Sequence, residues 1–171
     1  MQHRNEILTI IKVSHHFESA FSREQLYRLL RLKMEYNYFN SVLNGLLSEK
    51  VIIEKNGLLF LEDFEKACLD RQQWSRNLFG AHKKYLSILC KLPWIKYVSL
   101  TGANSFESCA REDDIDLFVI TSANRLWICY LLLVILSKLI RKRKIFCFNY
   151  LVDEDNLIFS ERNYFTAVQL V

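Results

Sequence analysis

The chain has 171 residues, of which 51% are hydrophobic and 25% are charged. A chain this apolar is not intrinsically disordered, and its 4 glycines and 1 proline exclude collagen-like and loop-rich scaffolds. The formal net charge of +4 is smaller than expected for a domain that mainly binds nucleic acid. The length allows one domain or two small ones.

The cysteines are odd in number and widely spaced, and they form no C-x-x-C motif. This pattern predicts reduced thiols and a cytoplasmic protein. Residues 1–6 include an acidic residue and no apolar core, so we do not expect a signal peptide. The histidines are not placed to complete a zinc site with the cysteines at Cys68, Cys90, Cys109, Cys129 and Cys147.

Residues 1–62 are predicted to form a winged-helix-like domain of three helices and a hairpin. Apolar periodicity predicts helices over about 5–17 and 38–49. Between them, Ser22 and Gln25 form a capping-box pattern that opens a further helix. The hairpin is predicted where Asn56-Gly57 separates two short apolar runs.

A winged helix often binds DNA through its third helix, but this one is poorly suited to phosphate contacts. Residues 35–49 contain no lysine or arginine, and residues 1–60 hold 8 basic and 6 acidic side chains. Phosphate binding requires cations that displace counterions. We therefore expect this domain to contact a protein partner rather than DNA.

The second part of the chain has an α/β pattern, which gives an α+β fold class overall. Residues 63–92 are predicted as connecting helices, with Leu69, Trp74 and Leu78 among the core-facing positions. Residues 93–171 are predicted as a small mixed-sheet domain. Its strands are expected at about 94–101, 115–121 and 144–152, and its helices at about 124–140 and 163–171.

Residues 126–140 are apolar enough to suggest a membrane span. The run is shorter than the ~20 residues that a span needs, and Lys138 interrupts it. A fully buried helix with Trp127 in the core is the favoured interpretation, with no membrane partner. The basic residues 141–144 are then a solvated helix end.

Two aspartates begin the predicted strand at 115–121. Asp114 and Asp116 are two residues apart, so strand geometry puts both carboxylates on one face. Such a pair can hold Mg²⁺, which retains several waters and can bind a triphosphate. Gly102, after the preceding strand, allows close approach of a phosphate. The simpler interpretation is an acidic loop with two solvated aspartates, because an isolated D-x-D is common.

The order of strand, Thr101-Gly102-Ala103, Asp114-Ile115-Asp116, apolar strand and apolar helix resembles the nucleotidyltransferase superfamily, which has the DNA-polymerase-beta-like fold. It is most similar to bacterial nucleotidyltransferase-domain proteins with an N-terminal winged-helix-like unit. The segments Ile120-Thr121-Ser122-Ala123-Asn124-Arg125-Leu126-Trp127, Cys147-Phe148-Asn149-Tyr150-Leu151 and Tyr164-Phe165-Thr166-Ala167 also resemble that group. The resemblance covers most of the chain.

The resemblance implies that Asp114 and Asp116 are catalytic and bind Mg²⁺. It implies a reaction in which a nucleoside monophosphate moves from a nucleoside triphosphate to an unknown acceptor, with release of pyrophosphate. The candidate nucleotide-binding and phosphate-binding residues are Thr101, Gly102, Ala103, Ser105 and Arg125. For Arg125, contact with a phosphate and an ion pair with Asp116 or Glu112 are equally open.

Three features depart from the superfamily pattern. Ala103 stands where the superfamily has serine, and the loop after it is charged and bulky rather than glycine-rich. A third carboxylate is expected on a later strand, where this chain offers Asn149. The departures leave a second hypothesis open, a catalytically inactive nucleotidyltransferase-fold module that binds or regulates. A DNA-binding regulator that uses residues 1–62 is a weaker third.

Overall fold

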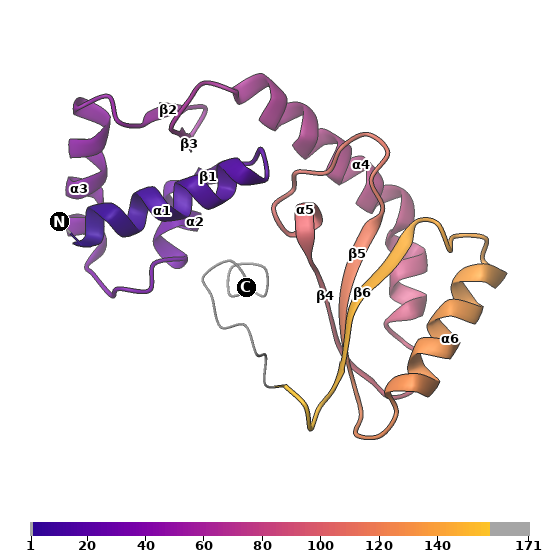
Figure 1. The fold of residues 1–171 in the computed structure, drawn as a ribbon. Helices are drawn as coiled ribbons and strands as arrows, with labels where there is room; N and C mark the ends of the chain where they lie inside the picture. The colour runs from indigo at the N-terminus through magenta and orange to yellow at the C-terminus, as the bar shows by residue number, and fades with distance from the viewer. Residues whose placement is uncertain (1, 158–171) are drawn as a thin grey trace. The chain divides into compact units, whose positions relative to one another are not determined.

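In the computed structural model, residues 2–157 are described, and they form six α-helices and two three-stranded sheets (Figure 1). The predicted α+β class is therefore confirmed. The chain divides into two units, unit 1 (Met1–Gln72) and unit 2 (Gln73–Val171). The division lies inside α4 (Glu65–Leu89), within the stretch predicted to connect two domains.

Unit 1 contains three helices and a small antiparallel sheet in the order β1-β3-β2. Ser22 caps α2 as predicted, because its hydroxyl accepts from the Gln25 amide and the Gln25 side chain accepts from the Ser22 amide. The strand β1 was not predicted, since two residues carry too little periodicity. The elements are α1 (Gln2–His16), β1 (Phe21–Ser22), α2 (Arg23–Arg28), α3 (Tyr36–Ser48), β2 (Ile53–Lys55) and β3 (Leu58–Phe60).

The hairpin of unit 1 turns at the predicted dipeptide. Asn56 and Gly57 both have positive φ, of 48° and 76°, as a type I′ turn requires. The turn sets the register of the β2–β3 pair, and β3 is central because it also pairs with β1. The core beneath is formed by fully buried apolar side chains from all three helices and from β3: Ile7, Ile10, Ile11, Leu26, Phe39, Leu43, Leu46, Leu59 and Phe60.

Unit 2 is built on a mixed sheet in the order β4-β5-β6. β4 is antiparallel to β5, whereas β6 is parallel to β5 and is reached through α6. β5 occupies the residues predicted for it. The elements are β4 (Ile95–Leu100), α5 (Gly102–Ser105), β5 (Ile115–Thr121), α6 (Leu126–Leu139) and β6 (Phe146–Asp153).

The two-residue period of β5 separates its faces. Ile115, Leu117 and Val119 are buried in a cluster with Leu89 of α4 and Leu133 of α6, so both helices pack on one face of the sheet. Asp116 and Phe118 point to the other face. The central strand therefore supplies a hydrophobic anchor on one side and leaves Asp116 half-buried on the other.

The sequence interpretation of α6 as fully buried is wrong. Trp127, predicted as core, is 79% exposed, and Leu131 is 58% exposed. One sheet face of three strands, shared with α4, covers only one side of the helix. Leu69, predicted as core-facing in α4, is likewise exposed.

Within residues 2–157, no helix combines the length and the apolar character needed to cross a membrane. The helix predicted at 163–171 lies outside the described residues.

Candidate metal and nucleotide site

Asp114 and Asp116 are brought together at the start of β5. One carboxylate oxygen from each, together with the Cys147 sulfur, forms a cluster in which the three atoms lie within 4.8 Å of one another. All three side chains are partly exposed. This arrangement is the one that the D-x-D spacing predicts when a strand begins at Ile115.

The third member of the cluster comes from β6. Cys147 is the register partner of Asp116 in the parallel β5–β6 pair. Asn149, two residues later, donates from Nδ2 to Asp116 Oδ1 at 2.6 Å and accepts from the Cys147 thiol at 2.9 Å. The strand on which the superfamily resemblance places a third carboxylate therefore supplies a thiol and an amide.

Gly102 lies directly against the Asp116 carboxylate. Its φ is +60°, and a Cβ atom built there would lie 2.9 Å from Asp116 Oδ2. The preceding Thr101 amide donates to the Asp116 carbonyl at 3.1 Å, which ties the turn to β5. Glycine is thus required here for its backbone conformation and for the space it leaves.

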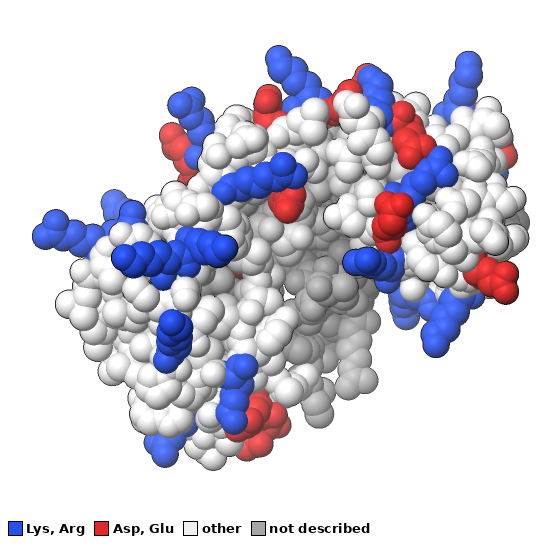
Figure 2. All heavy atoms as spheres, turned by 180° about the vertical axis from the view of Figure 1, so that it is seen from behind, with Lys and Arg blue, Asp and Glu red and all other residues white. Residues whose placement is uncertain are grey.

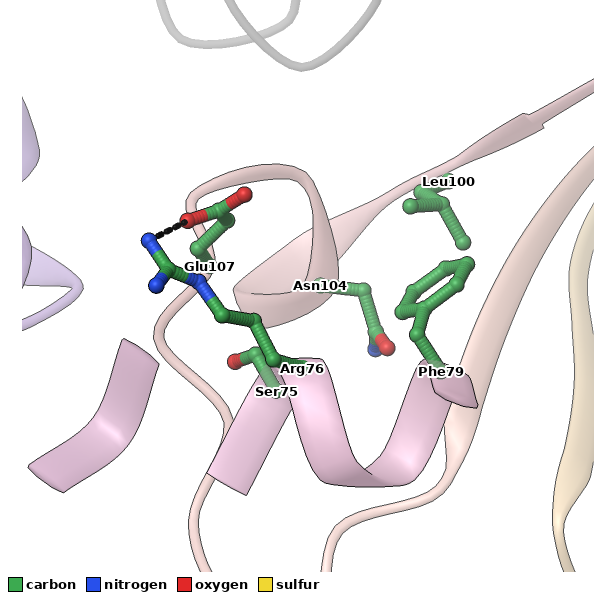
Figure 3. A pocket seen from close by; sticks show the side chains of 6 residues that line it. All are labelled: Ser75, Arg76, Phe79, Leu100, Asn104 and Glu107. Atoms are coloured by element: carbon green, nitrogen blue, oxygen red, sulfur yellow. Dashed lines mark ion pairs between the residues drawn. The ribbon is translucent and has the colours of Figure 1, made fainter. Parts of the chain in front are cut away.

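Asn104 holds the backbone of the other aspartate, Asp114, by a hydrogen bond. Its Nδ2 donates to the Asp114 carbonyl at 3.1 Å, while its Oδ1 is buried without a partner among the described residues. Figure 3 shows the Asn104 side chain extending from α5 toward α4. It lines a pocket of about 180 Å³. The exposed pair of Arg76 and Glu107 stands at its edge, 3.8 Å apart. The pocket also includes Ser75, Phe79 and Leu100.

The remaining candidates of the turn are placed differently. Ser105 is exposed and donates to the Gly102 carbonyl at 2.8 Å, and Ala103 is partly exposed. Thr101 is buried, and its hydroxyl has no partner among the described residues. Gly102, Ala103 and Ser105 therefore form the accessible part of the turn.

Arg125 is not brought to the aspartates. It follows the C-terminal end of β5, and that end lies about 23 Å along the strand from Asp114 at ~3.3 Å per residue. Its guanidinium lies over the Trp94 ring, 5.4 Å from the ring centre. The expected ion pairs with Asp116 or Glu112 are not formed, and we leave Arg125 out of the site.

Burial raises the pKa of the Asp116 carboxyl above its usual range, and the nearby Asp114 charge raises it further. The hydrogen bond from Asn149 acts in the opposite direction but is the smaller effect. The ionised site therefore holds unfavourable negative charge, which a bound cation would relieve.

Replacing Asp116 with asparagine should stabilise the metal-free protein at neutral pH. Because the folded-state pKa is raised, the wild-type carboxyl contributes stability below its ordinary pKa and loses it as pH rises through the folded value. The variant cannot lose that contribution, so its advantage should grow over the same interval. Urea unfolding across pH, without divalent ions, measures the difference; an unchanged difference at every pH would contradict this explanation.

The Cys147 thiol is held protonated at neutral pH. Burial raises its pKa, and the charges of Asp114 and Asp116 raise it further. Arg143, which donates to the Phe146 carbonyl at 3.0 Å, opposes this shift and is a cation that sequence reasoning did not assign to the site. Only its position just before β6 could have suggested it.

The donor atoms suit a divalent cation that prefers oxygen. Two carboxylates supply the hard ligands that Mg²⁺ and Mn²⁺ take, and both ions retain waters when protein ligands are few. A protonated thiol is a poor ligand for Mg²⁺. The residues present therefore fit a two-carboxylate site, with Asn149 orienting Asp116.

Comparisons of this chain with protein-family models, with curated proteins and with solved structures gave no match.

Proposed function

We propose that this chain is a nucleotidyltransferase that uses a divalent cation, Mg²⁺, held by Asp114 and Asp116. The observation that supports the proposal most is the Asp114–Asp116 pair on β5 with Gly102 packed against the Asp116 carboxylate. This geometry is what the resemblance to the nucleotidyltransferase superfamily implies. In the same proposal, unit 1 is a winged-helix-like domain and unit 2 has the nucleotidyltransferase fold.

In the proposed reaction, an oxygen of the acceptor bonds to the α-phosphorus of the nucleoside triphosphate, and the bond to the β-phosphate oxygen breaks. The acceptor loses a proton and pyrophosphate leaves. The bound cation would offset phosphate charge and orient the reacting groups. Asp114 and Asp116 would hold the cation, and Asn149 fixes the Asp116 rotamer through its hydrogen bond. The Gly102 turn leaves space for the phosphates to approach.

Pyrophosphate release tests this function. Purified protein with Mg²⁺ should release pyrophosphate from at least one of ATP, CTP, GTP and UTP when a mixture of cell metabolites supplies the acceptor. Asp116→Asn should reduce the rate at least ~100-fold, since charge stabilisation at the phosphates is lost. Glu112→Gln is the matched control, because it removes an exposed carboxylate from the same loop. Equal rates in both variants would contradict the proposal.

Cys147 and Ala103 favour a second candidate, a nucleotidyltransferase-fold module that binds a nucleotide without catalysis. A thiol occupies the β6 position opposite Asp116, and no hydroxyl stands at position 103. This candidate predicts that calorimetry detects nucleotide binding that depends on Mg²⁺ and Asp116, with no pyrophosphate released by any of the four nucleotides.

A further inference from the structure

The outer side of α6 carries a row of large apolar side chains that the described residues leave exposed. Trp127, Leu131, Ile135 and Leu139 recur every four residues, and we call them the apolar stripe. Trp127 is 79% exposed and Leu139 is 74% exposed. Residues four apart lie on one side of a helix, so the stripe is a continuous surface rather than scattered single contacts.

The acidic residues in the described part of unit 2 are confined to two short segments of the chain. Residues 73–106 and 117–152 contain no aspartate or glutamate, so the acids among residues 73–157 are confined to 107–116 and 153–155. The cations at Lys138 and at 141–144 therefore have no acidic neighbour along the chain. Figure 2 shows the same separation: over unit 2, at the left of the view, lysine and arginine side chains stand on a largely uncharged surface with acids at its edges.

Residues 141–144, which we call the basic segment, follow α6 and contact α4. Lys142 Nζ lies 5.4 Å from the centre of the Tyr85 ring, a cation–π contact between the segment after α6 and α4. Lys83 and Lys84 are exposed next to Tyr85 in α4. Arg141 and Lys144 are exposed at the end of α6. The cations at 141–144 thus follow the C-terminal end of the apolar stripe, and Lys142 contacts α4.

We propose that unit 2 docks on the surface of a bilayer rich in anionic lipids, with α6 lying in the interface. The apolar stripe would enter the boundary between headgroups and acyl chains, and the basic segment would meet the lipid phosphates. At 1.5 Å per residue, α6 is about 21 Å long, too short to span and long enough to lie flat. This inference goes beyond our expectation from the sequence of no membrane partner, since it concerns docking on a bilayer surface and not a membrane span, and it does not depend on the proposed function.

The combination of features favours a lipid surface over the other partners. Nucleic acid would satisfy the cations and leave the leucines of the stripe without an apolar contact. A second copy of unit 2 that used the same face would bring two basic segments together. An anionic bilayer offers phosphates to the cations and an apolar region to the apolar stripe. Lys138, which is exposed in α6, can extend its ammonium group toward the headgroups.

Vesicle co-sedimentation tests the proposal with the full chain. Vesicles of phosphatidylcholine alone and of phosphatidylcholine with phosphatidylglycerol are compared, without nucleotide. We expect binding to the mixed vesicles at least ~10-fold tighter, and screened by salt. Arg141→Glu with Lys144→Glu should remove most of that preference. Leu131→Ser with Leu139→Ser should weaken binding to the mixed vesicles by at least ~10-fold.

One control matches the change in total charge of the Arg141 and Lys144 variant. Lys12→Glu with Lys66→Glu reverses two exposed cations of unit 1 and should bind mixed vesicles like the wild type. Circular dichroism shows whether each variant is folded. With Trp74 and Trp94 replaced by phenylalanine, so that Trp127 is the remaining fluorophore of its kind, tryptophan fluorescence of the folded protein should shift to the blue with mixed vesicles. Overturning results are equal binding to both vesicle types, equal losses in the two charge variants, or self-association that the Leu131 and Leu139 changes abolish without vesicle binding.

Discussion

Replacing Gly102 with alanine should weaken divalent-cation binding at least ~10-fold, and should destabilise the fold by about 1–2 kcal/mol. The added Cβ would lie 2.9 Å from Asp116 Oδ2, so the carboxylate must move away from the position that Asn149 holds. The backbone φ of +60° is also unfavourable for alanine. Mn²⁺ titration followed by electron paramagnetic resonance gives the affinity, and urea unfolding gives the stability.

Alanine substitutions at two other glycines distinguish the effect of backbone strain on stability from the loss of cation binding. Gly57→Ala places alanine at φ +76° in the unit 1 hairpin with nothing within 4 Å, so it should lower stability and leave Mn²⁺ affinity unchanged. Gly80→Ala lies in α4 with nothing within 4 Å and should raise stability by about 0.5–1 kcal/mol. If Gly102→Ala kept the wild-type Mn²⁺ affinity, the contact between the Gly102 turn and Asp116 would have no role in cation binding.

Replacing Cys147 with aspartate should tighten Mg²⁺ and Mn²⁺ binding by about tenfold or more. The new carboxylate would stand opposite Asp116 on β6, in the cluster where the three side chains now place their ligand atoms within 4.8 Å. Three carboxylates satisfy more coordination positions of a hard cation than two carboxylates and a protonated thiol. The change would supply the third carboxylate that the superfamily pattern leads one to expect.

The same variant should depend on metal for its stability. Without a cation, three clustered carboxylates repel one another, so the metal-free variant should unfold at lower urea concentration than Cys147→Ser, the neutral control. Saturating Mn²⁺ should reverse that order, since a ligand that binds only the folded state stabilises it. If both variants bind Mn²⁺ with the wild-type affinity, Cys147 does not face the cation and our description of the cluster is wrong.

The sequence was most informative where local patterns dominate. The bounds of β5 follow from its apolar run, and the two-residue period puts Asp114 and Asp116 on one face. Ser22 and Asn56-Gly57 act through their own backbone neighbours, so their cap and turn could be predicted as well. Each of these features depends on residues within about ten positions of one another.

The rest depends on contacts between distant elements. That Cys147 stands opposite Asp116 requires the parallel register of β5 and β6, which no local pattern encodes. Arg125 was a candidate because it stands at the start of the predicted helix, where it could reach a phosphate, but a seven-residue strand carries the chain away from the aspartates. α6 is apolar on every side, so its sequence resembles a buried helix, and only the small sheet shows why one side is exposed.

Electron paramagnetic resonance of Mn²⁺, titrated into the protein with a non-hydrolysable nucleoside triphosphate, tests the central assignment most directly. Wild type and Glu112→Gln should each bind Mn²⁺ with matching affinity, and the bound signal should change when the triphosphate is added. Asp114→Asn and Asp116→Asn, shown to be folded, should lose that binding. Retention of wild-type Mn²⁺ affinity in both aspartate variants would contradict a cation site at the start of β5 and the transfer reaction proposed for it.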